Sequence, residues 1–537
     1  MSGLAREPSA RAAVRRSSGR NTREGPAVVA VMMSRRAVLR AAALGAASVG
    51  TLACSGRARR TAATPATRDV AGLVELLEKQ PRPGVLDSVA AEIRSGLNPV
   101  QLLTALMIAG SRTVLTRERF SKEQHSLVCP YAMHHAAALV TPSRRWEPLL
   151  WAVDYLKWAQ QEAQQYDAGP MPPPSAAALP SSAGAAEELG RAVEAFEGER
   201  AEVALVALLR SGDRRRAIGA LVRNGSRDFR HIGHKAIHVA NALRTLNVIG
   251  WGRHCEVAEV VLRPVAWTLA LHYDVPDRDL DGAWSRSRSA SALLPTSWHQ
   301  GAPSDAAITA LLAMFRKGDQ QAATDVVVEW LCRGAAPRSI WEAMLLSGAE
   351  LLLTHPGAVE ALHAVTASNA AYAAYLASAE DTDRRLLLLQ NASRVAEFHD
   401  YAARSARRRN TAALEFAIEV LDAAPGASGD DALADISHTV RSGPEQTPRI
   451  ARMALAYLSA GEARHQTLGR HALERAIDTT DDTHDFKLPV AALEDAARLS
   501  PQWRARYLAA CTPAFRGAGE PRTELADRID ALTRDLE

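Results

Sequence analysis

The residues best suited to chemistry lie in one short segment, where three histidines follow one another at intervals of three and four positions. They are His231, His234 and His238. On an α-helix, which turns about 100° per residue, these positions fall within about 60° of one another. Three imidazoles on one helix face can ligate a metal ion or a haem iron, or carry protons to a substrate. We therefore predict them as metal ligands; the alternative is that they are core histidines with satisfied hydrogen bonds.

Two cations, Arg230 and Lys235, accompany these histidines. Positive charges beside imidazoles lower their pKa values and can hold an anionic group of a substrate. We predict catalytic roles for His234, Lys235 and His238. Arg230 and Asn241, at the two ends of the segment, are predicted to bind the substrate.

A further pair of histidines comes from an internal repeat. Residues 96–160 align without a gap on residues 334–398, so that His125 falls on His363. The alignment also pairs Gly96 with Gly334, Pro99 with Pro337, Ala105 with Ala343, and Gly110 with Gly348. Such a match predicts two similar halves that face each other, with the paired histidines near their junction. The alternative is chance similarity between helical segments rich in Ala and Leu. We assign His363 to catalysis and His125 to substrate binding.

A second constellation lies near the C-terminus, where residues 481–487 read Asp-Asp-Thr-His-Asp-Phe-Lys. Lys235 aligns with Lys487 at an offset of 252, close to the offset of 238 in the first match. This match predicts a second copy of the histidine-rich helix, in which most histidines are lost. His484 and Lys487 are its catalytic candidates.

Three segments, 231–246, 362–366 and 484–496, resemble bacterial members of the questin oxidase-like family and occur in the family's order. The resemblance implies an all-helical oxidase that opens an aromatic ring by Baeyer–Villiger-type oxygenation, without a recognisable flavin fold. It implies site residues at the following positions: His231 or His234, His238, His363, His484 and Lys487. The chain departs from the family in having three histidines in the first segment where the pattern has two. It also carries an export signal, which leaves the substrate open.

Common cofactor motifs are missing from the sequence. There is no Gly-rich dinucleotide fingerprint after a strand, no phosphate-binding loop, no HExxH, no GxSxG and no CxxCH. The cysteines are scattered singly, so neither thiolate zinc nor iron–sulfur sites are supported. A Rossmann-type flavin or NAD site is therefore not expected, and the cofactor is unknown, with iron, copper or haem as the candidates.

The body of the chain is predicted to be all-α. Apolar residues recur with helical spacing in windows throughout the sequence, and alternation typical of strands is never sustained. The windows are 70–80, 99–110, 148–162, 200–210, 256–271, 305–316, 338–353 and 384–398. Pro99 and Pro337 are each expected at the start of a helix. We predict a first helical half over 70–283, a linker over 284–304 and a second half over 305–537, together forming a bundle or solenoid-like body.

Residues 1–54 are predicted to be a twin-arginine export signal. Arg35 and Arg36 precede an apolar stretch of small residues over 41–53 that has no acidic side chain. Leu52-Ala53-Cys54 is similar to a lipobox, so Cys54 is the predicted lipidation site, with ordinary signal cleavage as the alternative. Residues 55–69 form the expected linker, and the mature protein is expected to be periplasmic or membrane-anchored.

Charge argues against a nucleic-acid partner. The chain has a formal net charge of +4, but residues 1–60 hold 12 Arg and two Glu, so the remainder has 52 basic and 58 acidic side chains. No basic stripe with interleaved aromatic residues occurs. A small-molecule substrate is expected, and contact with a membrane only through the lipid anchor. We predict an exported oxidoreductase acting on an aromatic or polyketide-like ring; the alternative is a non-catalytic helical lipoprotein that binds a ligand or a metal.

Overall fold

The computed structural model describes residues 69–114, 120, 122–166, 174, 179–227, 229–272, 281–426, 429, 431–440, 442–534 and 536. The all-α prediction is confirmed, since the regular structure in these residues is helical apart from one isolated bridge between Ala302 and Ala335. Each predicted helical window coincides with an observed helix. The export signal over 1–54 with Cys54, and the linker up to residue 68, lie outside the described residues.

Three hydrophobic clusters organise the helices. The first joins N-terminal and C-terminal elements: α2 (Val70–Lys79), α3 (Arg82–Arg94), α4 (Pro99–Thr113), α6 (Pro130–Leu139), α7 (Glu147–Ala163), α21 (Glu462–Thr479), α22 (His484–Arg498) and α24 (Glu524–Thr533). The second contains α8 (Ala185–Glu194), α9 (Gly198–Arg210), α10 (Arg214–Gly225), α11 (His234–Ile249) and α12 (Glu256–Ala270).

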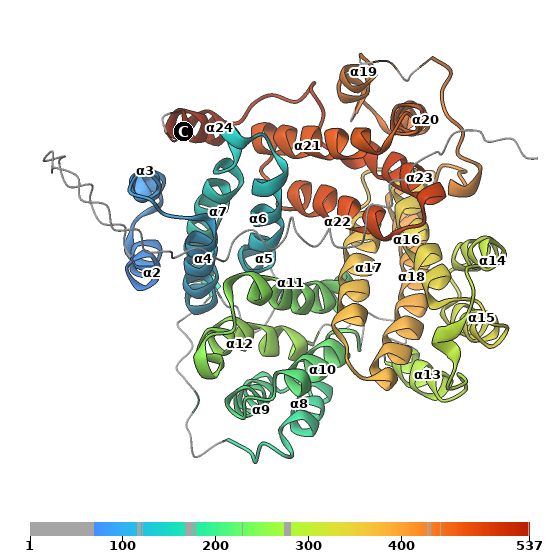
Figure 1. Cartoon of the computed structure of the whole chain (residues 1–537), viewed down its shortest axis with the longest axis horizontal. Helices are drawn as coiled ribbons and strands as arrows, with labels where there is room; N and C mark the ends of the chain where they lie inside the picture. The colour runs from blue at the N-terminus through green and yellow to red at the C-terminus, as the bar shows by residue number, and fades with distance from the viewer. Residues whose placement is uncertain are drawn as a thin grey trace, which may run out of the picture. The chain divides into compact units, whose positions relative to one another are not determined.

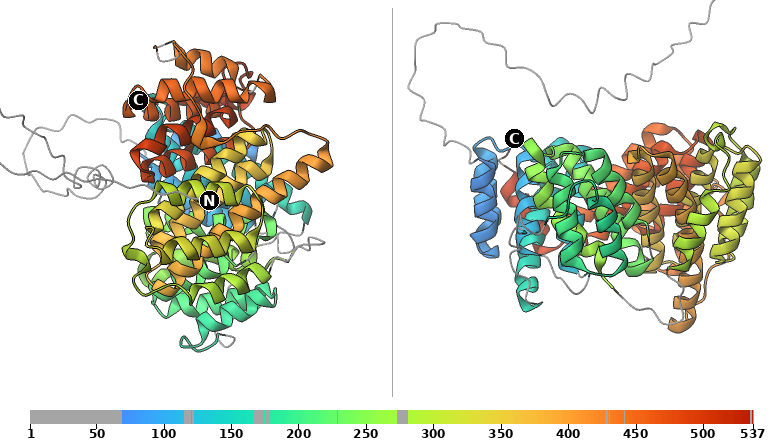
Figure 2. Two further views of the ribbon diagram at one scale, coloured as in Figure 1. Left: turned by 90° about the vertical axis from the view of Figure 1, so that its right-hand side faces the viewer. Right: turned by 90° about the horizontal axis from the view of Figure 1, so that it is seen from below.

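The third cluster is built mainly from the helices that follow α12 in the chain. Its helices are α13 (Gly282–Ser291), α14 (Asp305–Phe315), α15 (Gln320–Cys332), α16 (Pro337–Thr354), α17 (Val359–Ala377), α18 (Asp381–Arg409), α19 (Ala432–Thr439), α20 (Thr447–Leu458) and α23 (Pro501–Cys511). Helices α19 to α21 and helices α8 to α10 lie at opposite ends of this body in Figures 1 and 2.

The division into a first half over 70–283 and a second half over 305–537 remains a prediction, and the hydrophobic clusters contain residues from both. Residues 64–537 form one compact unit. Leu473, Phe486 and Ile529, from the end of the chain, share a hydrophobic cluster with α2 to α7. The segment 284–304, expected as a linker, contains most of α13 because Trp284 and Ala290 are buried on one side of a helix.

Local signals explain how the two aligned segments begin. Pro99 and Pro337 each occupy the first turn of a helix, where a missing N–H costs nothing. Gly96 and Gly334, two residues before the respective caps, both have positive φ, at 103° and 88°. Helices α4, α6 and α7 of the first segment correspond to α16, α17 and α18 of the second. These parallels agree with the internal repeat, which remains a prediction.

Four helix–helix contacts join the three hydrophobic clusters. Helix α17 packs against both α11 and α22, while the short α5 (His125–Val128) packs against α11, and α6 packs against α22. These helices meet near the centre of the view in Figure 1. Among the described helices, none combines the length and the apolar character needed to cross a bilayer.

Candidate functional site

Four histidines from four different helices converge at this junction. The Nε2 atoms of His125 and His234 are 3.1 Å apart, and those of His363 and His484 are 3.2 Å apart. The ring centroids of His234 and His363 are separated by 4.4 Å, and those of His125 and His484 by 5.3 Å. The four imidazoles therefore form one cluster, although segments of more than 100 residues separate the members of each close pair.

Helix starts position three of these side chains. His125, His234 and His484 are each the first residue of a helix, α5, α11 and α22 respectively. Before α11, Gly233 has φ +90°, and a Cβ there would lie 2.7 Å from the Cβ of Ala367 on α17. Glycine thus allows the beginning of α11 to approach α17, which carries His363.

The other ring nitrogen of each of these three histidines has a hydrogen-bond acceptor. His125 Nδ1 lies 3.2 Å from the Lys122 carbonyl oxygen, and His234 Nδ1 lies 2.7 Å from that of His231. His484 Nδ1 lies 2.7 Å from the Asp482 carboxylate. Carbonyl and carboxylate oxygens only accept, so each Nδ1 carries the proton and donates it. Each Nε2 consequently presents a lone pair to the centre of the cluster.

The environment keeps these imidazoles neutral. Burial lowers the pKa of His125, His234 and His363 well below the usual value, and the neighbouring histidines and Lys487 lower it further. The pKa of His484 is also lowered by burial, against the opposing effect of Asp482. Although burial disfavours the Asp482 carboxylate, its hydrogen bond with His484 holds the pKa of that group below its usual range.

This arrangement can hold a metal ion. Ligand nitrogens of His125, His234 and His484 all lie within 4.8 Å of one another. Nitrogens bound tetrahedrally at about 2.0–2.1 Å from an ion are separated by about 3.3–3.4 Å, close to the 3.1 Å between His125 and His234. Converging lone pairs repel unless a cation or a proton lies between them. Hydrogen bonds from Nδ1 to carbonyl and carboxylate oxygens are the usual outer-shell support of metal-bound histidine. Imidazole donors suit zinc, copper, iron or nickel.

His363 and Lys487 complete the cluster outside the group of three. His363 is fully buried, and its Nε2 faces that of His484. Lys487 lies one helical turn after His484 on the same face of α22 and is only 4% exposed. Its Nζ atom has no hydrogen-bond partner among the described residues, and burial lowers the pKa of this amine. An imidazole and a buried amine are thus placed beside the three potential ligands.

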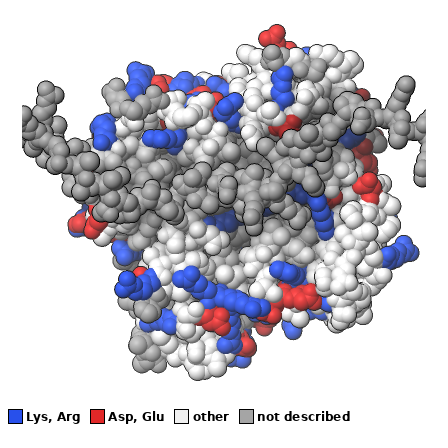
Figure 3. Space-filling view, in the orientation of Figure 1, with Lys and Arg blue, Asp and Glu red and all other residues white. Residues whose placement is uncertain are grey.

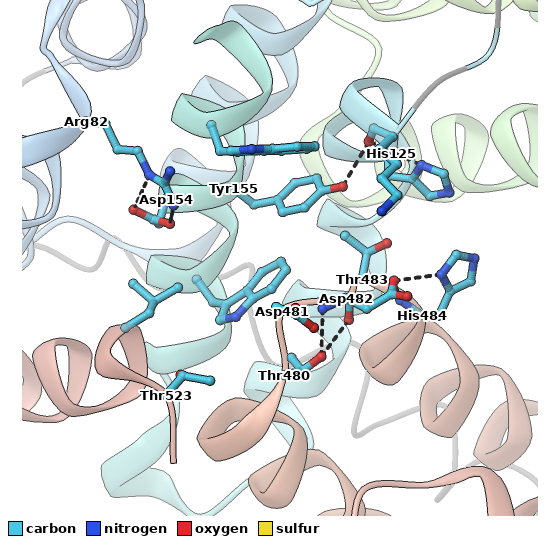
Figure 4. Close-up of a pocket in the computed structure, with 14 residues that line it drawn as sticks. Arg82, His125, Asp154, Tyr155, Thr480, Asp481, Asp482, Thr483, His484 and Thr523 are labelled. Atoms are coloured by element: carbon cyan, nitrogen blue, oxygen red, sulfur yellow. Dashed lines mark hydrogen bonds and ion pairs between the residues drawn. The ribbon is translucent and has the colours of Figure 1, made fainter. Parts of the chain in front are cut away.

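A cavity of about 500 Å³ opens onto this cluster. His125 and His484 lie in its wall, and Trp151, Tyr155 and Trp158 provide an aromatic side (Figure 4). The rings of Trp151 and Tyr155 are stacked at 5.1 Å, and the Tyr155 hydroxyl donates a hydrogen bond to the Lys122 carbonyl. The cavity can therefore accept a flat ligand next to two cluster histidines.

A second cavity, of about 340 Å³, reaches the cluster from another direction. Asp482 and His484 line both cavities. The remaining wall of the second cavity is largely apolar, with Leu352, Leu362 and Ile450 among its residues. The Asp482–His484 pair therefore separates two spaces of different character.

The structure corrects the geometry predicted for the first histidine motif. His231 precedes α11 and has left-handed backbone angles in the short 3₁₀ segment η5 (Arg230–Gly233), so that its carbonyl, not its ring, supports His234. His238 points to Thr268, with Nδ1 3.0 Å from the hydroxyl oxygen. Of the three expected metal ligands, only His234 belongs to the group of three, because α11 begins too late to place His231 on the same face.

Three other predicted residues have contacts away from the cluster. Arg230 forms an ion pair with Asp281, at 2.9 Å, and Lys235 lies over the Phe196 ring. The Asn241 amide donates to the Val128 carbonyl, which fixes α11 against α5. These contacts give no support for a direct substrate contact by Arg230 or Asn241, or for a catalytic contact by Lys235.

Two residues that contact the histidine cluster were not predicted from the sequence. Asp482 holds His484 through both the ring and the backbone N–H, at 2.7 and 2.9 Å. An Asp two residues before a histidine at a helix start is a recognisable local signal. Phe120, whose ring stacks on His234 at 4.2 Å, carries no such signal, because the contact depends on the tertiary fold.

Comparison of the chain with protein-family models, with curated protein sequences and with solved structures gives no match. The resemblance to the questin oxidase-like family therefore remains a prediction. On the face drawn in Figure 3, basic and acidic side chains of the described residues are interspersed. The expected absence of a nucleic-acid partner is likewise still a prediction.

Proposed function

We propose that this protein is an exported, metal-dependent oxidoreductase that oxidises an aromatic or polyketide-like ring. The observation that carries the proposal is the convergence of three Nε2 lone pairs, from His125, His234 and His484, with each Nδ1 held by an acceptor. Three nitrogen ligands leave an open coordination position, which is typical of catalytic metal sites.

The cavity beside the cluster supports the substrate class. Its volume of about 500 Å³ lies within the range of small-molecule sites. The half-buried rings of Tyr155 and Trp158, whose centroids are 5.0 Å apart, offer apolar surface for a planar ligand, with the buried Trp151 stacked behind Tyr155. A ring bound against them lies next to His125 and His484, which line the same space.

Oxygen insertion into a ring C–C bond sets the chemical requirements. Hydrogen peroxide supplies one oxygen atom and leaves water, whereas dioxygen needs two further electrons from a reductant. Both routes need a base for the peroxide proton and a positive group near the oxyanion that develops on the substrate. His363 is the base in our proposal, because it is neutral and adjacent to the ligands. Lys487 is the positive group.

A second candidate is a non-catalytic helical protein that binds a metal or a ligand. Burial favours it: His234 is 7% exposed and His363 is fully buried, so that a bound ion is well shielded from solvent. The two candidates differ in whether the open coordination position accepts an exogenous molecule.

The first test is the metal content of protein purified without chelator or affinity metal, together with its visible absorption spectrum. We expect about one ion per chain, lost in His125→Ala, His234→Ala and His484→Ala. The matched control is His438→Ala, since His438 is exposed and its ring is hydrogen-bonded to the Ala434 carbonyl of the same helix. Retention of the metal in all three variants would refute the centre. The second test measures consumption of oxygen or peroxide in the presence of hydroxylated polycyclic aromatics. Consumption supports the oxidoreductase, and its absence supports the non-catalytic binding protein.

A further inference from the structure

Lys487 is a buried amine without a partner for its donors among the described residues. It is 4% exposed, and its Nζ atom has no hydrogen-bond partner there. Burial lowers the pKa of this amine, against the raising effects of Cys129 and Asp482, because a buried positive charge without a hydrogen-bonded partner is costly. An anion bound beside the amine would favour its protonated, positively charged form, and an orphaned buried donor of this kind indicates a missing ligand. Lys487 follows His484 by three residues on α22 and lies near enough to lower the pKa values of all four cluster histidines.

The neighbouring groups do not neutralise this charge. The nearby Cys129 thiol is protonated, since burial raises its pKa to about 11. The Asp482 carboxylate is already bonded to the His484 ring and backbone N–H. The histidines are neutral, so a divalent ion bound here would face one carboxylate. The site would then keep a net positive charge of about one, or about two with Lys487 protonated, and unbalanced charge is strongly disfavoured in a buried environment.

Two helices add to the positive potential. His234 and His484 are the first residues of α11 and α22, which have 16 and 15 residues. The N-terminal ends of both helices therefore point to the cluster and favour an anion there. Among the described residues, Asp482 is the carboxylate that is hydrogen-bonded to one of the four imidazoles.

We propose that the metal ion and Lys487 together bind a small inorganic monoanion, such as hydroperoxide, with one end on the open coordination position and the other accepting a hydrogen bond from the Lys487 ammonium. This inference rests on the proposed metal centre. It gives Lys487 a role in binding the oxidant, in addition to its proposed role near the oxyanion that develops on the ring substrate. The ring substrate occupies the aromatic cavity on the side of His125 and His484.

Azide is the probe, because it is a monoanion of similar size that does not react. The full-length protein is loaded with Co²⁺, whose visible bands report ligation, and azide is titrated at constant pH and ionic strength. We expect at least tenfold weaker azide binding in Lys487→Met, and binding within about threefold of wild type in Lys487→Arg. Lys317→Met, which removes an exposed lysine, is the control and is expected to bind azide as wild type does.

Cobalt affinity separates this inference from the metal centre itself. Removing a positive charge next to the ion is expected to leave Co²⁺ binding by Lys487→Met equal to or tighter than that of wild type. A purely structural role predicts weaker cobalt and azide binding together. If Co²⁺ binds but azide affinity is the same in wild type and Lys487→Met, the anion site is overturned and the metal centre is not. Absence of a cobalt spectrum in the wild-type protein would overturn the centre and with it the anion site.

Discussion

Asp482→Asn tests the site with the smallest change of shape. The carboxylate accepts hydrogen bonds from the His484 ring, at 2.7 Å, and from the His484 backbone N–H, at 2.9 Å. Asn can accept both hydrogen bonds through its amide oxygen. It lacks the negative charge of Asp482, which raises the pKa of the His484 ring. Outer-shell substitutions of this kind typically weaken metal binding 10- to 100-fold. We therefore expect a loss of about 1.4–2.8 kcal/mol in metal-binding free energy.

Competition with a chromophoric chelator, at fixed pH, measures the dissociation constant. Asp481→Asn is the matched control: it makes the same chemical change at the neighbouring position, where the side chain is 96% exposed. We expect its metal affinity to stay within twofold of wild type. Equal affinity of Asp482→Asn and Asp481→Asn, in a protein whose metal is lost in His484→Ala, would refute the assigned role of Asp482.

Three further predictions concern stability and ligand binding. Gly233→Ala is expected to destabilise the protein by about 1–3 kcal/mol in urea unfolding, since its Cβ would meet Ala367, while Gly357→Ala, with a similar φ but open space, should cost less. Burial lowers the pKa of His238 to about 4, below its unfolded value of about 6.5, so the unfolded chain binds more protons between these values. The free energy of unfolding should fall as the pH drops from 6.5 to 4, by at most about 3 kcal/mol from this group, and His238→Asn should flatten the slope. Trp158→Ala, at a half-buried ring in the cavity wall, is expected to weaken binding of a planar aromatic ligand about tenfold in fluorescence titrations, with metal content unchanged; equal binding would exclude the aromatic wall as the docking surface.

The helices were predictable because their signals are local. Pro99 and Pro337 begin helices as expected, and the periodic windows all became helical. The segment 284–304, predicted as a linker, contains most of α13, because a stretch rich in Ser and Arg still buries Trp284 and Ala290. Burial of a few apolar side chains outweighed the weak helix propensity of its serines.

The members of the site were predictable, but their arrangement was not. His125, His234, His363 and His484 were all candidates, yet the sequence favoured ligands from one helix. Helical periodicity assumes that the helix extends through His231, whereas the left-handed backbone at His231 and Ile232 delays its start. Convergence of four helices depends on packing between clusters, which no local spacing encodes.

The position of the histidine cluster also has a consequence for maturation. Its closest pairs join residues 109 and 121 positions apart, drawn from three separate hydrophobic clusters. An ion held there would act as a removable cross-link between segments that packing alone otherwise holds together. Its ligands would come together only when the helices of these clusters have packed against one another. Metal binding would then report completed assembly, and protease resistance of the loops between the helices would distinguish metal-loaded from metal-free chains.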